Sequence, residues 1–107
     1  MTRTLNTVHT TWGQSQQSKE FAPGIVFHST AGHGGFVLSA EKHKELQAKF
    51  EFKTFAGGSN YEEDCDAAVV VVAFPQFFTE DQQQRARLQV LSNPEYYGNV
   101  TAWIKAN

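Results

Sequence analysis

The sequence predicts an α+β protein in which a small antiparallel sheet of about three strands packs against three to four helices. The strands fall in the N-terminal half, where short β-branched and aromatic runs alternate with glycine and proline. The helices come from the C-terminal two-thirds, where N-cap residues and capping boxes precede apolar stripes. Strands first and helices later is the α+β order. The length of 107 residues suits a single domain over residues 1–107.

Three strands are predicted, over residues 7–12, 25–30 and 36–38. Residues 13–19 are polar and predict a turn. Alternation in the second strand places Phe27 on one face and His28 on the other. Residues 31–35, which read Ala-Gly-His-Gly-Gly, predict a loop because glycine removes any regular backbone preference.

Helices are predicted over residues 40–50, 59–74, 79–91 and 95–105. Ser39 is the predicted N-cap of the first, and Thr79 with Gln82 forms a capping box at the third. A short edge strand is predicted over residues 52–55 from the alternation of its side chains. Five apolar residues are expected to be buried by the first and third helices: Leu46, Phe50, Ala86, Val90 and Leu91.

The segment over residues 59–74 fits two structures. Ser59 with Glu62 matches a capping box, and the acidic residues that follow suit a helix N-terminus. The four consecutive valines at residues 69–72 are instead typical of a buried central strand. We favour a buried helix, which Pro75 would end.

Composition excludes several classes of protein. The net charge of −2 argues against direct nucleic-acid binding, and the single cysteine excludes an internal disulfide or a thiolate zinc cluster. No apolar run reaches 18 residues, so no membrane span is predicted. Residues 1–8 are polar and lack the apolar region of a signal peptide. We therefore expect a cytoplasmic protein, with no cofactor.

Acidic side chains concentrate in the second half of the chain. Residues 1–58 carry six basic and four acidic side chains, whereas residues 59–107 carry three basic and seven acidic ones. Such a surface steers positively charged partners. Apolar anchors are expected beside it, since two adjacent tyrosines on one helix cannot both be buried. The predicted partner-binding residues are Glu62, Glu63, Asp64, Asp66, Phe78, Tyr96 and Tyr97.

The glycine-rich loop from His28 to Gly35 is the alternative site. Its backbone N–H groups could approach an anion, with His28 or His33 as general base. The loop lacks the lysine of a P-loop, and a tight structural turn explains the same residues. The acidic run lacks calcium-loop spacing, so no metal site is predicted, although one acid could join His28 or His33 in space.

Cys65 is not expected to be a nucleophile. An activated thiolate needs positive neighbours, whereas Cys65 lies between Asp64 and Asp66 and close to Glu62. Its place on an apolar stripe indicates a small core residue.

A set of motifs resembles a small uncharacterised domain family found in bacteriophages, plasmids and related mobile elements. The motifs lie within residues 11–78 and read TWG (11–13), APGI (22–25), ST with HGG (29–35), LS (38–39), YEEDCD (61–66) and AFP (73–75). The resemblance implies a single domain in a mobile-element setting and carries no activity with it.

These observations lead to two functional hypotheses. The first is a non-enzymatic, stoichiometric protein of a mobile element that binds and inhibits a bacterial protein complex, as anti-CRISPR and other anti-defence inhibitors do. Its surface would combine the acidic and aromatic residues named above. The second is a small hydrolase or ligand-binding enzyme centred on the loop from His28 to Gly35. A structural component of a phage particle is a third reading.

Overall fold

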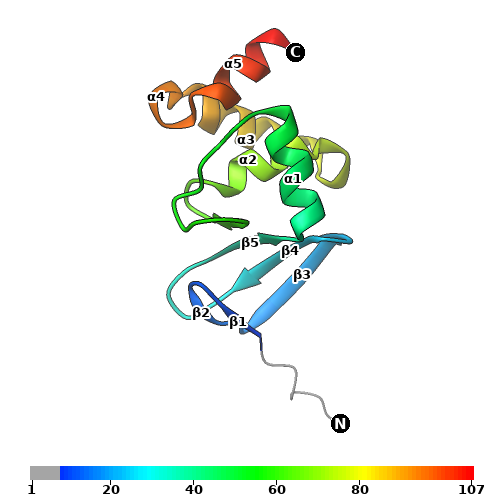
Figure 1. The fold of residues 1–107 in the computed structure, drawn as a ribbon, viewed down its shortest axis with the longest axis vertical. Coiled ribbons are helices and arrows are strands. Elements are labelled where there is room, and N and C mark those ends of the chain that lie inside the picture. The colour runs from blue at the N-terminus through cyan, green and yellow to red at the C-terminus, as the bar shows by residue number, and fades with distance from the viewer. Residues whose placement is uncertain (1–7) are drawn as a thin grey trace.

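The computed structural model describes residues 8–107, with the strands at one end and the helices at the other (Figure 1). Four antiparallel strands form the main sheet in the order β3-β4-β5-β6, spanning Gln17–Ala22, Ile25–Ser29, Gly34–Leu38 and Asn60–Glu62. A separate hairpin pairs β1 (His9–Thr10) with β2 (Gly13–Gln14). The predicted α+β class is confirmed, with a sheet one strand larger than expected.

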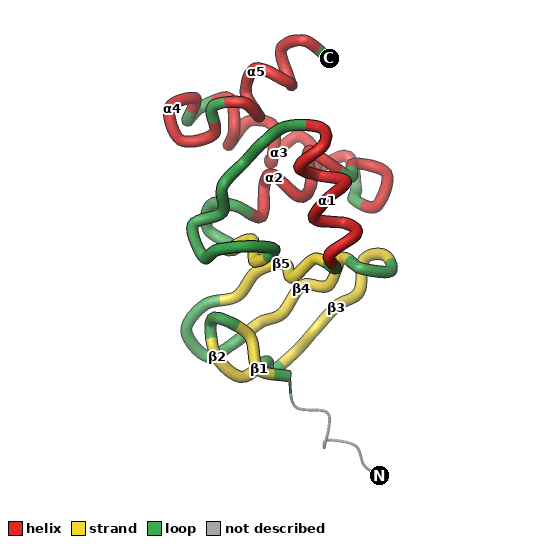
Figure 2. The backbone as a smooth tube through the Cα atoms, viewed as in Figure 1, coloured by secondary structure: helices red, strands yellow, loops and turns green. Residues whose placement is uncertain are grey.

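Within residues 8–107, five α-helices lie on one side of the main sheet, with α4 and α5 farthest from it (Figure 2). They span Ala40–Lys49 (α1), Ala67–Ala73 (α2), Glu80–Leu91 (α3), Pro94–Tyr97 (α4) and Asn99–Ala106 (α5), and a 3₁₀ turn η2 spans Pro75–Phe77. None of these helices within residues 8–107 is both long and apolar enough to cross a bilayer.

The N-terminal strands differ from the prediction over residues 7–19. The chain turns at Thr11 and Trp12 between β1 and β2, so no continuous strand spans 7–12. Residues 1–7, which include Thr7 of this strand and most of the segment predicted to lack a signal peptide, lie outside the described residues. The predicted turn over 13–19 instead holds β2 and the start of β3. Polar residues fit there because β3 is an edge strand exposed to solvent.

The two faces of the sheet have different neighbours. Phe27 pairs with Phe36, which pairs with Tyr61, and these side chains face the helices. His28 pairs with Gly35, which pairs with Glu62, so these residues share the opposite face. The β1–β2 hairpin covers that face, because the Trp12 ring lies over Gly35 and Ser15 bonds to His28.

The helix α1 begins where it was predicted. The Ser39 hydroxyl accepts a 3.1 Å hydrogen bond from the Lys42 N–H, and both Leu46 and Phe50 are buried. The predicted edge strand over 52–55 does not form. The backbone N–H and C=O of Phe52 both form hydrogen bonds with the Gln47 side chain, so these groups are not available to pair with a neighbouring strand.

The segment over residues 59–74 contains both of the structures that the sequence suggested. Residues 60–62 form β6 along β5, so the predicted capping box of Ser59 with Glu62 is not used. The chain then turns, and α2 begins at Ala67. The four valines lie in this helix and all are buried, which confirms the buried helix over its second half. Packing on every side outweighs their weak helix propensity.

The C-terminal helices follow the prediction with two corrections. Thr79 and Gln82 form the predicted capping box, with hydrogen bonds of 2.9 and 3.1 Å, and Ala86 and Val90 are buried. Leu91 was predicted to be buried, but it is 38% exposed at the solvent side of the last turn of α3. The single helix predicted over 95–105 is broken at Gly98, whose φ of 46° suits only glycine.

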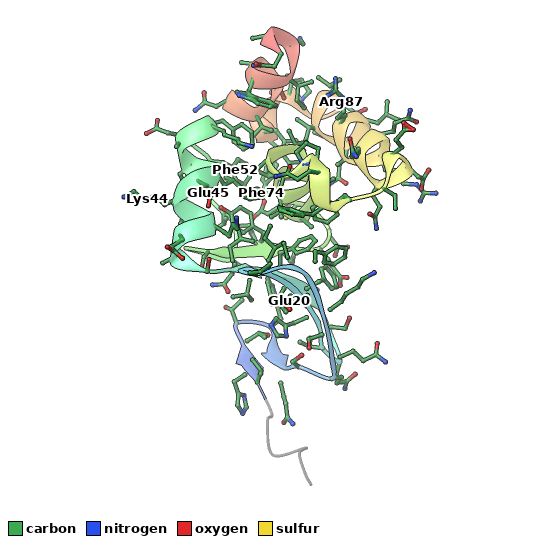
Figure 3. The ribbon with its side chains drawn as sticks, turned by 90° about the vertical axis from the view of Figure 1, so that its right-hand side faces the viewer. Glu20, Lys44, Glu45, Phe52, Phe74 and Arg87 are labelled. Carbon is green, nitrogen blue, oxygen red and sulfur yellow. The ribbon has the colours of Figure 1, made fainter. Side chains whose placement is uncertain are left out.

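Aromatic side chains fill the space between α1, α2 and the C-terminal helices. Figure 3 shows Phe74 and Phe52 pointing into this space, whereas Glu20 and Lys44 point outward. Phe74 is 2% exposed, and the ammonium groups of Lys42 and Lys49 lie 5.6 and 5.3 Å from its ring centre. These contacts hold α1 against the end of α2.

Candidate functional site

The acidic run after β6 does not form one surface. Glu62 lies on the hairpin face of the sheet with a side chain 14% exposed, whereas Glu63 and Asp64 are exposed. Asp66 is fully buried. The prediction that all four acids present a single exposed patch is therefore wrong. The strand β6 and the turn after it send successive side chains in different directions.

Asp66 is a structural carboxylate. One of its oxygens accepts a 2.6 Å hydrogen bond from the backbone N–H of Phe55, and the other accepts a 2.5 Å bond from the Tyr96 hydroxyl. These bonds join the 52–55 loop and α4 to the start of α2. Such partners are what a buried carboxylate needs, so Asp66 is explained without any ligand.

The predicted aromatic anchors also divide. Tyr97 is 3% exposed, and its hydroxyl donates a 2.7 Å bond to the Cys65 carbonyl, so it cannot contact a partner. Tyr96 is 46% exposed, which confirms that one of the two tyrosines faces solvent. Burial of its hydroxyl end and the bond to Asp66 raise the pKa of Tyr96. Phe78 was predicted as an exposed anchor, but it stacks on Phe21 in the core.

Cys65 has the environment of an unreactive thiol. Burial raises its pKa to about 11, and the carboxylates of Asp66 and Glu62 add to this shift. The thiol lies 3.4 Å from Glu62 Oε1, to which it donates a hydrogen bond. Its chemistry therefore fits a packing and orienting role, not that of a nucleophile.

His28 is enclosed under the β1–β2 hairpin. Its ring is 7% exposed, and Nδ1 lies 2.9 Å from the Ser15 hydroxyl. Burial lowers the pKa of His28 below its ordinary value, so the neutral ring is favoured. A general base must reach a substrate, and the covered position of His28 prevents this.

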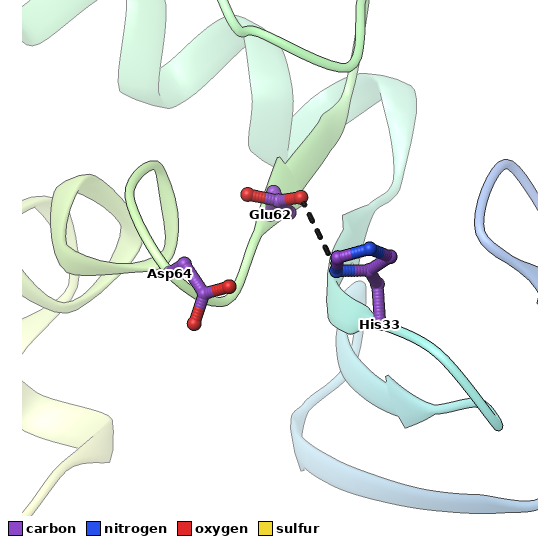
Figure 4. A group of neighbouring side chains, drawn as sticks. All are labelled: His33, Glu62 and Asp64. Carbon is purple, nitrogen blue, oxygen red and sulfur yellow. Dashed lines mark ion pairs between the residues drawn. The ribbon is translucent and has the colours of Figure 1, made fainter.

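His33 lies at the outer end of the same loop and meets two of the acids. Its Nδ1 is 3.8 Å from Glu62 Oε2, and ligand atoms of His33, Glu62 and Asp64 all lie within 4.8 Å of one another (Figure 4). The loop is held by Thr30, whose N–H donates a 2.9 Å bond to the His33 carbonyl. The Glu63 N–H donates a 2.9 Å bond to the Gly34 carbonyl, which fixes the acidic turn beside the loop.

An apolar groove of about 330 Å³ lies between the helix-facing side of the sheet and the helices α2 and α3. Its walls include four phenylalanines that the sequence did not bring together, namely Phe21, Phe27, Phe36 and Phe78. Charged side chains of Glu63 and Arg85 lie at its edge. Phe78 thus belongs to a groove wall, although it is not an exposed anchor.

The fold and these features define an α+β protein with an apolar groove on one face of its sheet and a histidine–carboxylate cluster toward the other. The chain belongs to the family described as a domain of unknown function, DUF7007, which matches residues 6–107. This membership places the chain in an uncharacterised family, while the mobile-element setting stays a prediction. No curated protein and no solved structure matches the chain.

Proposed function

We propose that this chain is a non-enzymatic, stoichiometric interaction protein of a mobile genetic element, which binds and inhibits a bacterial protein complex. A nucleic-acid-handling defence complex such as a CRISPR effector is the partner that the mobile-element resemblance suggests. The chain would act in the cytoplasm of the host by contacting protein, without binding nucleic acid directly or entering a membrane.

The apolar groove between the sheet and α2–α3 carries this proposal. Phe21 and Phe27 are only half-buried at its mouth, so part of the aromatic wall stays accessible to a partner side chain. Glu63 is exposed at its edge and adds a negative charge that favours basic partners. A concave aromatic surface with a charged rim is the arrangement that protein interfaces use for anchoring.

A second exposed aromatic pair supports the same function. Phe55 is 75% exposed and Tyr96 is 46% exposed, and the buried Asp66 accepts hydrogen bonds from the Phe55 backbone N–H and from the Tyr96 hydroxyl. Pre-positioned aromatic side chains lose little entropy when a partner covers them. Tyr96 therefore remains among the proposed binding residues, and Phe55 is added to them.

Substitution of Glu63 by lysine tests this proposal. Tagged wild-type protein is expected to co-purify in a one-to-one complex with a purified defence complex and to suppress its activity. Glu63→Lys should weaken this binding at least tenfold and reduce its salt sensitivity. Glu63 is a cleaner choice than Glu62, because reversing Glu62 would also break its contact with His33.

The matched control is Glu51→Lys, which makes the same charge change at an exposed position outside the groove. Its affinity should equal that of the wild type. If both variants lost affinity equally, the loss would come from the change in net charge and not from the position of Glu63. Failure of the wild-type chain to bind or inhibit any defence complex would contradict the proposal.

A further inference from the structure

We propose that His33, Glu62 and Asp64 form a binding site for a divalent transition-metal ion, with Zn²⁺ as the best chemical match. The three residues come from the loop before β5, from β6 and from the turn that follows it. None of the three residues lines the apolar groove, so the site can be tested separately from the proposed inhibitor function.

The distances are close to those of a metal centre. Zn²⁺ binds imidazole nitrogen and carboxylate oxygen at about 2.0–2.2 Å, so neighbouring ligands in a tetrahedral site are about 3.4 Å apart. His33 Nδ1 and Glu62 Oε2 are already 3.8 Å apart, and all three ligand atoms lie within 4.8 Å. Small side-chain rotations at the exposed His33 and Asp64 would close the remaining distance.

The charge of the cluster is uncompensated. Within residues 8–107, no lysine or arginine lies within ion-pairing distance of Glu62 or Asp64, and the only ion pair of either carboxylate is with His33. The two neighbouring carboxylates repel each other less once a divalent cation lies between them.

The surrounding contacts orient the ligands. The Cys65 thiol donates to Glu62 Oε1 and leaves Oε2 directed at His33. Glu62 is paired with Gly35 across β5–β6, so no side chain opposes it on that strand. Supporting contacts of this kind hold metal ligands in place.

The mixed donor set selects the metal. Imidazole favours zinc and its neighbours in the transition series, whereas an all-oxygen site would favour Mg²⁺ or Ca²⁺. Three protein ligands with an exposed histidine leave a coordination position open to water, as in zinc sites that bind a further group. The thiol of Cys65 is not among the clustered ligand atoms, so the site does not need it.

Calorimetric titration of chelator-treated protein with Zn²⁺ alone tests the site. One Zn²⁺ per chain is expected to bind, and its presence should raise the melting temperature. His33→Ala, Glu62→Gln and Asp64→Asn should each weaken binding at least tenfold and abolish the rise in melting temperature. Circular dichroism without metal checks that each variant is folded.

Two matched controls separate a built site from surface binding. His9→Ala removes another exposed imidazole, and Glu63→Gln removes a neighbouring exposed carboxylate, so both should bind Zn²⁺ like the wild type. Absence of stoichiometric binding, or equal weakening in the controls, would overturn the proposal. Tighter binding of Mg²⁺ or Ca²⁺ than of Zn²⁺ would overturn the choice of metal.

Discussion

His28 and His33 flank one glycine-rich turn, but only His33 reaches solvent. His28 lies under the hairpin with Ser15 as its hydrogen-bond partner, whereas His33 points toward Glu62 and Asp64. The difference follows from the strand pairing, because His28 is inside β4 and His33 lies between β4 and β5. The two histidines of this short motif therefore have different roles. His28 is structural, whereas His33 is accessible to ligands.

The burial of His28 makes folding stability depend on pH. Burial is the cause of its lowered pKa, so the unfolded chain binds a proton at a higher pH than the folded protein does. The stability that neutral His28 contributes is present above its ordinary pKa of 6.5 and is lost as pH falls through the lower folded value. The free energy of urea unfolding should therefore decrease as pH falls from about 7 to about 5.5.

His28→Gln should remove this part of the pH dependence, because glutamine can still bond to Ser15 but does not titrate in this range. His9→Gln, at an exposed position, should leave the pH dependence unchanged. Equal slopes for wild type and His28→Gln would show that His28 does not couple folding to protons.

The residues of the candidate sites were predictable only one at a time. Local sequence predicts that one of the two adjacent tyrosines is exposed and that Cys65 is unreactive, but it does not say which tyrosine faces solvent. The burial of Asp66 does not, because its partners Phe55 and Tyr96 are distant in the chain. From sequence alone, a carboxylate in an acidic run is predicted to be exposed, because the distant groups that stabilise its burial are not known.

At the scale of elements, β5 depends on glycine where the chain is crowded. A Cβ at Gly35 would lie 2.7 Å from the Trp12 ring and even closer to the Tyr61 carbonyl oxygen. A Cβ at Gly32, in the loop just before, would meet nothing within 4 Å. Neither glycine has a positive φ, so the difference between them comes from packing alone.

Gly35→Ala is therefore expected to destabilise the fold by about 1–3 kcal/mol, since the hairpin and β6 must both move to admit a methyl group. Gly32→Ala should stay within about 0.5 kcal/mol of the wild type. Urea unfolding of both variants measures the difference. Equal stabilities would mean that Trp12 does not pack against β5 in solution.

The elements that the sequence predicted well are those with local signals. The capping box at Thr79 and the N-cap at Ser39 form as predicted, because each needs only residues within one helical turn. The capping box predicted at Ser59 does not form. Residues 60–62 instead make strand hydrogen bonds with the edge of β5, and no local pattern predicts this pairing. Long-range pairing decided between two locally acceptable structures.

At the scale of the whole molecule, the groove and Glu62 of the histidine–carboxylate cluster lie on opposite faces of one sheet. The groove includes Phe27 and Phe36, whereas Glu62 is paired with Gly35 on the other face. Alternation along β5 and β6 separates the two sites. Variants at one site should therefore leave the other intact, and the two proposals can fail independently.

A continuous core joins the two ends of the molecule. It runs from Ile25 and Phe36 in the sheet through the valines of α2 to Val100 and Ile104 in α5. Asp66 adds hydrogen bonds between distant loops at its centre. A core shared in this way predicts that residues 8–107 unfold as one cooperative unit.

The two tryptophans allow this to be tested, because Trp12 lies in the turn between β1 and β2 and Trp103 lies in α5. Figure 1 shows this hairpin and α5 at opposite ends of the fold. Trp103→Phe leaves a fluorescent reporter at the sheet end, and Trp12→Phe leaves one at the helical end. In each variant, the urea transition seen by fluorescence should coincide with that seen by far-ultraviolet circular dichroism. If the fluorescence of the Trp12→Phe variant changed before its circular dichroism, α5 would detach before the rest unfolds, and the single-domain prediction would fail.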